Sequence, residues 1–202
     1  MEQAQQTTRQ SVFKTVLLLI LASVLALALT GCGSSSSSAP SYSEEEQSEI
    51  DSAPEEYQNA LSKAQSYSDT MHMSKDAIYN QLTSEYGEQF EKKAAKFAME
   101  HIQADWNANA LASAQSYSEN MHMSKQGIYN QLISDMADKF TKKQAQYAID
   151  NLEADYNANA LAKAKEYREN MDMSKDAIYD QLISDYGEKF TKKQAKYAVD
   201  NM

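Results

Sequence analysis

The chain has only one cysteine, two prolines, five glycines and three histidines in its 202 residues. A single cysteine cannot form a disulfide within the chain, and it excludes the paired-cysteine motifs that bind zinc. The histidines are His72, His101 and His122, so none lies beyond position 122. No glycine-rich loop is present that would hold a phosphate group. We therefore predict that the protein is not an enzyme and that it needs no metal ion and no dissociable cofactor.

The first 32 residues have the pattern of a secretory signal. Two basic residues flank a polar start, and an apolar run from Val16 to Leu29 leads to a Leu-Thr-Gly-Cys sequence that ends at Cys32. The run is shorter than the ~20 residues of a membrane-spanning helix. The final four residues resemble a bacterial lipobox, which predicts removal of residues 1–31 and a covalent lipid on Cys32. A free cysteine that merely ends the apolar run is the alternative.

A lipid on the first residue of the mature chain predicts an anchor on the extracytoplasmic face of the bacterial cell membrane. Residues 32–56 follow as a serine-rich stretch and an acidic run, with seven acids and no base. Low hydrophobicity and charge of one sign leave nothing to bury, so this segment is predicted to be a disordered tether. A flexible linker of this length spans roughly 25–30 Å. The rest of the chain should therefore stay near the membrane.

Internal repetition with a period of 50 residues dominates the remainder. The string from Met71 to Lys75 returns 50 and 100 residues later, with Asp172 in place of the histidine. Each copy contains three segments with helical spacing of apolar residues. The sequence thus predicts an all-α protein of three tandem helix-turn-helix-like repeats, each about 50 residues long. Their predicted bounds are 57–106, 107–156 and 157–202.

Local signals predict where the helices begin. In the third copy, Asn157 or Asn159 is suited to cap the first helix. Ser124 is placed to cap the second helix of the middle copy, and Thr141 forms a capping box with Gln144 at the start of the third helix. The first copy has Glu91 at the corresponding cap, so its third helix should fray more easily.

Turns and junctions are predicted in the same way. Gly87 and Gly187 are placed to end the second helix in a left-handed conformation, whereas the middle copy has Ala137 and should turn differently. A 50-residue unit is marginally stable alone, so neighbouring copies should touch. Trp106 and Tyr156 lie where the copies meet, and we predict that they pack there.

Lysine pairs recur at the start of the third helix of every copy. They are Lys92, Lys93, Lys142, Lys143, Lys192 and Lys193. Because lysine opposes the macrodipole at a helix N-terminus, the recurrence makes these residues candidate contacts for a partner. Solvated surface charges are the alternative. The copies carry net charges of −2, −2 and 0, which disfavours nucleic acid, and an exported protein does not meet the chromosome.

The Met-His-Met strings at 71–73 and 121–123 would suit copper(I), whose preferred ligands include thioether and imidazole. The second methionine of each string is also expected to pack as a hydrophobic staple, and the third copy has Asp172. Packing is therefore the favoured interpretation.

The complete repeat resembles that of the Ltp family of host-cell surface-exposed lipoproteins. The residues that carry the resemblance are Met173 to Leu182, Gly187, Phe190, Lys192 to Ala195 and Tyr197-Ala198, together with the lipobox. The family occurs in Gram-positive bacteria and their prophages. The resemblance implies superinfection exclusion, in which an anchored protein blocks DNA injection by a second phage, and it implies a phage tail protein as partner. A structural or adhesive envelope lipoprotein that binds wall polymer or a host surface is the alternative.

Overall fold

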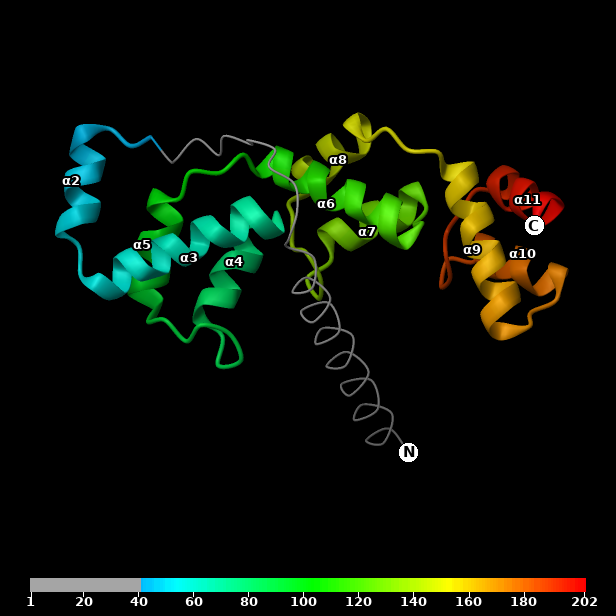
Figure 1. Cartoon of the computed structure of the whole chain (residues 1–202), viewed down its shortest axis with the longest axis horizontal. Helices are drawn as coiled ribbons and strands as arrows, with labels where there is room; N and C mark the ends of the chain where they lie inside the picture. Colours follow the sequence, from blue (N-terminus) through cyan, green and yellow to red (C-terminus); the bar gives the residue numbers. More distant parts are fainter. Residues whose placement is uncertain (1–40) are drawn as a thin grey trace, which may run out of the picture. The chain divides into compact units, whose positions relative to one another are not determined.

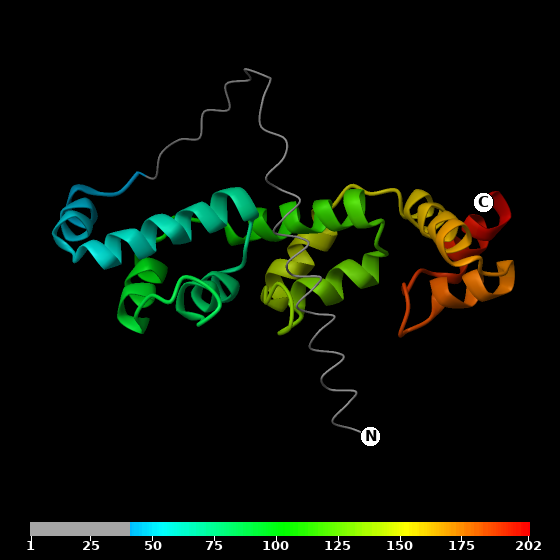
Figure 2. The same cartoon turned by 60° about the horizontal axis from the view of Figure 1, so that its bottom comes forward.

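The structure, a computed structural model, describes residues 41–202. Within that range the regular secondary structure is entirely α-helical, as predicted. A first helix, α2 (Glu44–Ser52), precedes three groups of three helices. The groups are α3 (Glu55–Met71), α4 (Lys75–Thr83) and α5 (Lys92–His101); α6 (Trp106–Met121), α7 (Lys125–Ile133) and α8 (Lys142–Asn151); and α9 (Tyr156–Met171), α10 (Lys175–Ile183) and α11 (Lys192–Asn201). Figures 1 and 2 show the three helices of each group lying together. We call these groups repeats 1, 2 and 3.

The helix α2 corrects the prediction that all of residues 32–56 form a disordered tether. The Ser43 side chain accepts a hydrogen bond from the Glu46 N–H, and the Glu46 carboxylate accepts one from the Ser43 N–H at 3.0 Å. Acids in the first turn also complement the helix macrodipole. Ile50 is only 8% exposed because it lies in the hydrophobic cluster of repeat 1. A capping box and one isoleucine therefore order part of a segment whose charge predicts disorder.

The remaining caps follow the predictions in part. Ser74, Ser124 and Ser174 cap the second helices, and Thr141 and Thr191 form the expected capping boxes. The caps expected from Asn157 or Asn159 were wrong. Asp155 caps α9 instead, and its carboxylate accepts hydrogen bonds from the N–H groups of Asn157 and Ala158 at 2.9 and 3.0 Å.

Repeat 1 replaces the missing third-helix cap with a contact between helices. Glu91 makes no side-chain capping hydrogen bond, as predicted. Its own N–H instead donates to the Glu56 carboxylate of α3 at 3.2 Å. This bond satisfies one of the N–H groups that the first turn of a helix leaves free.

Each repeat buries its own small core. The pair of residues at the centre of each core has no exposed surface, and each of these side chains contributes roughly 1.5–3 kcal/mol on burial. These pairs are Ile78 and Leu82, Ile128 and Leu132, and Ile178 and Leu182. Trp106 packs against the cluster of repeat 1 and Tyr156 against that of repeat 2, as predicted. Because α6 and α9 begin at these two residues, each ring belongs to one repeat and packs on the preceding one.

A left-handed residue ends the first helix of every repeat. His72, His122 and Asp172 have φ values of 51°, 51° and 49°. Histidine and aspartate are among the few residue types with a side chain that enter this region readily. The middle residue of each of the three strings, Met-His-Met in repeats 1 and 2 and Met-Asp-Met in repeat 3, is therefore a C-terminal cap, a position that histidine and aspartate both suit.

The turn between the second and third helices differs from its prediction. The left-handed residues are Gln89, Lys139 and Lys189, and not Gly87 or Gly187. Glycine is required for a different reason, since a Cβ atom at Gly87 would lie 2.2 Å from the Gln81 carbonyl oxygen. That carbonyl accepts the Glu88 N–H at 3.0 Å.

The middle repeat has Ala137 at the position of these glycines. There the Gln131 carbonyl accepts a hydrogen bond from the Ser134 N–H at 3.3 Å. The added methyl group thus accompanies a different pattern of hydrogen bonds, and the predicted difference in the middle turn is confirmed.

A tyrosine of the first helix fastens this turn in every repeat. Tyr67 donates a hydrogen bond to Glu88, and Tyr167 donates one to Glu188 at 2.5 Å. In repeat 2 the shorter Asp138 accepts from Tyr117 at 2.7 Å, while its Oδ2 atom is buried without a partner. Burial raises the pKa of Asp138 to about 6, although the Tyr117 bond favours the ionised form.

Polar contacts join consecutive repeats at equivalent positions. The side-chain amide of Asn109 is buried and donates to the Ser68 hydroxyl at 2.9 Å and to the Met73 carbonyl at 3.1 Å. One repeat later, Asn159 donates to Ser118 at 2.9 Å and to the Met123 carbonyl at 3.0 Å.

A second contact crosses each junction. The Ser74 hydroxyl, which caps α4, donates to the Asp138 carbonyl of repeat 2. The Ser124 hydroxyl of repeat 2 donates in the same way to the Glu188 carbonyl of repeat 3 at 2.5 Å. The serine that starts the second helix of one repeat therefore also holds the turn of the next repeat.

Removing the junction amide should weaken docking of the repeats. We expect Asn159→Ala to lower the free energy of unfolding by about 1–3 kcal/mol, because the buried Ser118 and the Met123 carbonyl lose a donor. Asn59→Ala is the matched control, since Asn59 occupies the same position in repeat 1 but is exposed. Urea denaturation of both variants measures the difference, and equal losses would contradict the assigned role.

Asp138 should make stability depend on pH. Its folded-state pKa of about 6 lies above the ordinary value of 3.8, so ionisation opposes folding. The free energy of unfolding should therefore rise as the pH falls from about 7.5 to about 5.5. Glu46, Glu88 and Asp200 have lowered pKa values, so their protonation changes the free energy of unfolding only in more acidic solution.

The Asp138→Asn variant should be more stable than the wild type at neutral pH by roughly 1–2 kcal/mol, and it should lose this pH dependence. Asp135→Asn changes an exposed acid of the same turn and serves as control. Thermal unfolding at several pH values tests the assignment. Parallel curves for the wild type and Asp138→Asn would refute it.

Candidate partner-binding surface

The predicted lysine pairs lie on the surface. Lys92, Lys142 and Lys192 begin the third helices, and they and the lysine that follows each of them are exposed. In repeat 2 one of the pair, Lys143, lines a depression of about 500 Å³ together with Thr141 and Gln144 of the capping box and the residues around Trp106. Each pair belongs to its own repeat. Because the lysines are exposed, they remain predicted contacts for a partner. Cys32 lies outside the described residues.

Besides the methionine that ends each first helix, large apolar side chains are exposed at two recurring places. The first is the turn before the third helix, where Tyr86, Met136 and Tyr186 are 92%, 81% and 103% exposed. The second is the outer side of the third helix, where Tyr147 and Tyr197 are 42% and 43% exposed. Neither group could be predicted from the sequence, because the spacing that indicates a helix does not show which apolar residues lack a neighbour.

A small pocket marks the junction between repeats 1 and 2. Asp76, Tyr79 and Asn80 of α4 line it together with Asp135 and Lys139 from the turn of repeat 2, and its volume is about 160 Å³. Its opposed charges and small volume suit contact with solvent or with a protein surface better than enclosure of a small ligand.

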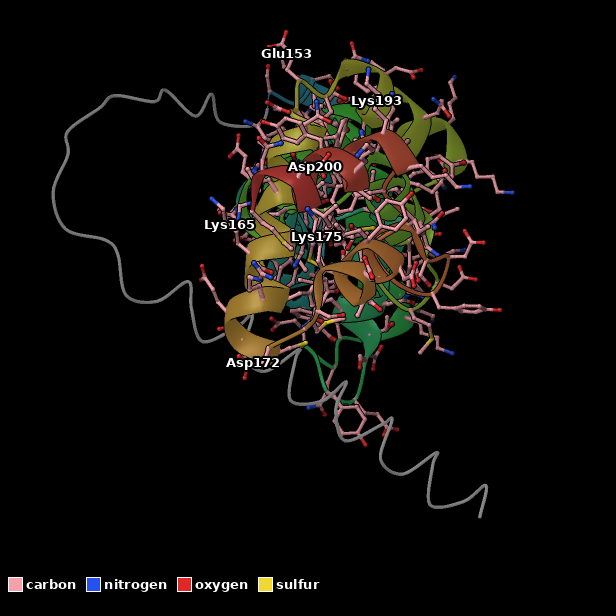
Figure 3. All side chains as sticks on the ribbon, turned by 90° about the vertical axis from the view of Figure 1, so that its right-hand side faces the viewer. Glu153, Lys165, Asp172, Lys175, Lys193 and Asp200 are labelled. Carbon is pink, nitrogen blue, oxygen red and sulfur yellow. The ribbon has the colours of Figure 1, made fainter. Side chains whose placement is uncertain are left out.

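Two ion pairs near the end of the third repeat are exposed. The Lys196 ammonium group lies 2.9 Å from the Asp200 carboxylate, and this hydrogen bond raises the pKa of Lys196 and lowers that of Asp200. Lys175 of α10 reaches the same carboxylate at 3.5 Å, and Figure 3 shows Lys175 close to Asp200. These contacts fix the end of α11 and leave Lys193 at its start exposed to solvent.

Within residues 41–202, no group of three or more His, Cys, Asp or Glu side chains is placed to hold a metal ion. No helix in the same range is long and apolar enough to cross a bilayer.

Comparison with known proteins identifies the family. A model of the host cell surface-exposed lipoproteins, the Ltp lipoprotein family, matches residues 55–102, 105–152 and 155–202. No curated protein matches. The solved structure of Ltp, a superinfection exclusion protein from the Streptococcus thermophilus temperate phage TP-J34, is 40% identical and covers 50% of this chain and 99% of that chain, with a TM-score of 0.46. Because the family model matches all three repeats, the chain belongs to the family of host cell surface-exposed lipoproteins.

Proposed function

We propose that this protein is a lipid-anchored surface lipoprotein that excludes superinfecting phages by blocking injection of their DNA. The observation that carries the proposal is the family match over all three repeats. The same function is named for the phage protein described above. The partner is an incoming phage tail protein, which the helical repeats bind close to the membrane.

The anchor is the lipid on Cys32. It keeps the repeats near the outer face of the membrane, where an injection device must arrive. Stable anchoring needs two acyl chains or more, since one chain binds only marginally. Three repeats that engage one target together would bind with higher avidity than a single repeat does.

The near-neutral charge of the repeats argues against sequence-specific binding of the injected DNA itself. A protein that binds DNA carries a basic patch or stripe, whereas the three predicted repeat segments have net charges of −2, −2 and 0. A protein component of the phage is therefore the better partner.

Expression of the full chain in a susceptible Gram-positive host should lower the plating efficiency of some tailed phages while their adsorption stays normal. Cys32→Ala should restore plating, because the repeats are then no longer held at the membrane. Plating and adsorption are measured together on a phage panel, with surface exposure of the full chain verified. Unchanged plating together with binding to purified cell wall would favour the envelope lipoprotein instead.

The lysine pairs should contribute to partner binding. We expect Lys192→Glu with Lys193→Glu to raise plating efficiency by about tenfold or more, and the pairs at 92–93 and 142–143 to act in the same direction. Acids at a helix N-terminus favour the helix, so unfolding would not explain the loss of exclusion.

Lys75→Glu with Lys125→Glu is the matched control, because both lysines are exposed first residues of second helices and the change in net charge is identical. Equally strong exclusion by the wild type and by all lysine variants would show that these lysines do not contribute to partner binding.

A further inference from the structure

The helix α2 covers one side of repeat 1. Its Glu49 carboxylate lies 3.6 Å from the His101 ring on α5. The Gln58 side chain on α3 donates to the carbonyls of Asp51 and Ala53, at 3.2 and 2.9 Å. Ile50 is buried in the cluster of this repeat, and Tyr42 packs against the same cluster. The acidic helix therefore binds repeat 1 through an apolar contact and a few polar ones.

We define the outer face of a repeat by four positions on its first and third helices. In repeat 1 they are Gln58, Leu61, Phe97 and His101, and the rings of Phe97 and His101 lie 4.3 Å apart. The equivalent residues are Ala108, Leu111, Tyr147 and Asn151 in repeat 2, and Ala158, Leu161, Tyr197 and Asn201 in repeat 3.

The outer face is open in repeats 2 and 3. Tyr147 and Tyr197 are 42% and 43% exposed, whereas Phe97 is only partly exposed. Leu61 is buried at 6%, but its equivalents in the other repeats are half-buried. Asn151 is exposed and donates to the Tyr147 carbonyl of its own helix at 2.8 Å, unlike His101, which reaches α2. The same face thus occurs three times and has a helix on it once.

Lysines border the outer face in all three repeats. Lys143 and Lys193 lie four residues before the exposed tyrosines, as Lys93 does before Phe97, and residues at this spacing share one side of a helix. Repeat 3 also has Lys165, four residues after Leu161, where repeat 1 has Gln65. Figure 3 shows Lys165 on α9 and Lys193 on α11, two helices of the same repeat. The helix α2 contains five acids and no base, so its chemistry complements these lysines.

We propose that the outer faces of repeats 2 and 3 bind a short acidic helix of a protein partner, with one bulky aliphatic residue placed as Ile50 is on repeat 1. A half-exposed tyrosine suits such a contact, because its ring packs against an apolar side chain while its hydroxyl stays polar. Two equivalent faces on one chain allow a partner with two such helices to bind by avidity.

This inference deepens the proposed function, because it names the faces that the phage component would contact. The α2 of a second copy is a weaker candidate occupant. Every α2 is joined by a short connection to its own repeat 1, and its high effective concentration there favours the intramolecular site.

A synthetic peptide of residues 42–53 is the probe, with a photo-crosslinking residue at position 48, which is exposed in α2. It is added to the full chain in lipid vesicles, and the crosslinked sites are mapped by mass spectrometry. We expect crosslinks on α8 and α11. An Ile50→Asp peptide should label about tenfold less or lower still, because it cannot bury the aliphatic side chain.

The face variant combines Tyr147→Glu with Tyr197→Glu and should lose the crosslinks on both helices. Its control combines Tyr86→Glu with Tyr186→Glu, the same chemical change at exposed turn positions, and should keep them. Labelling that is insensitive to Ile50→Asp, or confined to α3 and α5, would overturn the proposal. So would a dimer of the full chain that Ile50→Asp in the chain itself dissociates, because the occupant would then be a second copy.

Phage plating separates this inference from the proposed function. If the wild type and the control exclude phages but the face variant does not, both are supported. If all three exclude equally, the proposed function stands and the outer face is not the partner site. If the wild type fails to exclude any phage, the proposed function fails, and the crosslinking result alone decides whether the faces bind an acidic helix.

Discussion

The buried amides of Asn109 and Asn159 hold the array of repeats together. A 50-residue helical unit without disulfide or metal buries too little surface to be very stable by itself. Each amide inserts between the end of one first helix and the loop that follows it, donating to a buried serine and a backbone carbonyl. An unmade bond at such a site would leave polar groups buried without partners, so the register between repeats is strongly specified.

The two ends of the array show the same constraint by contrast. Asn59 and Ser174 are exposed, and within residues 41–202 no neighbouring repeat is docked on either of them. At the position of the buried Ser68 and Ser118, repeat 3 has the exposed Arg168. A long charged side chain there is compatible with solvent and incompatible with a docked asparagine.

Much of the fold follows from local signals in the sequence. The three helical units and their contacts were predicted from the 50-residue period, from the capping serines and threonines, and from the aromatic residues at the junctions. Two features could not be predicted, because they depend on contacts that the spacing of residues along the chain does not show. Gly87 is required by the approach of the Gln81 carbonyl rather than by its own φ. Asn159 resembles a helix cap, yet its amide is used by the preceding repeat.

The comparison among the three copies explains why the candidate site could be predicted only in part. The lysine pairs are visible in the sequence, because they recur at fixed spacing. The outer face is not visible in the sequence, because its significance depends on α2, which lies within an acidic segment that composition alone assigns to the tether.

Where α2 covers the outer face, the third helix has Phe97 and His101. Where the face is open, the third helix has tyrosine and asparagine at those positions. A ring without a hydroxyl and a base facing Glu49 suit a covered surface, whereas a tyrosine hydroxyl remains solvated until a partner arrives. The substitutions thus follow the presence of α2, as expected if the face is a binding surface occupied internally in one repeat and left free in two.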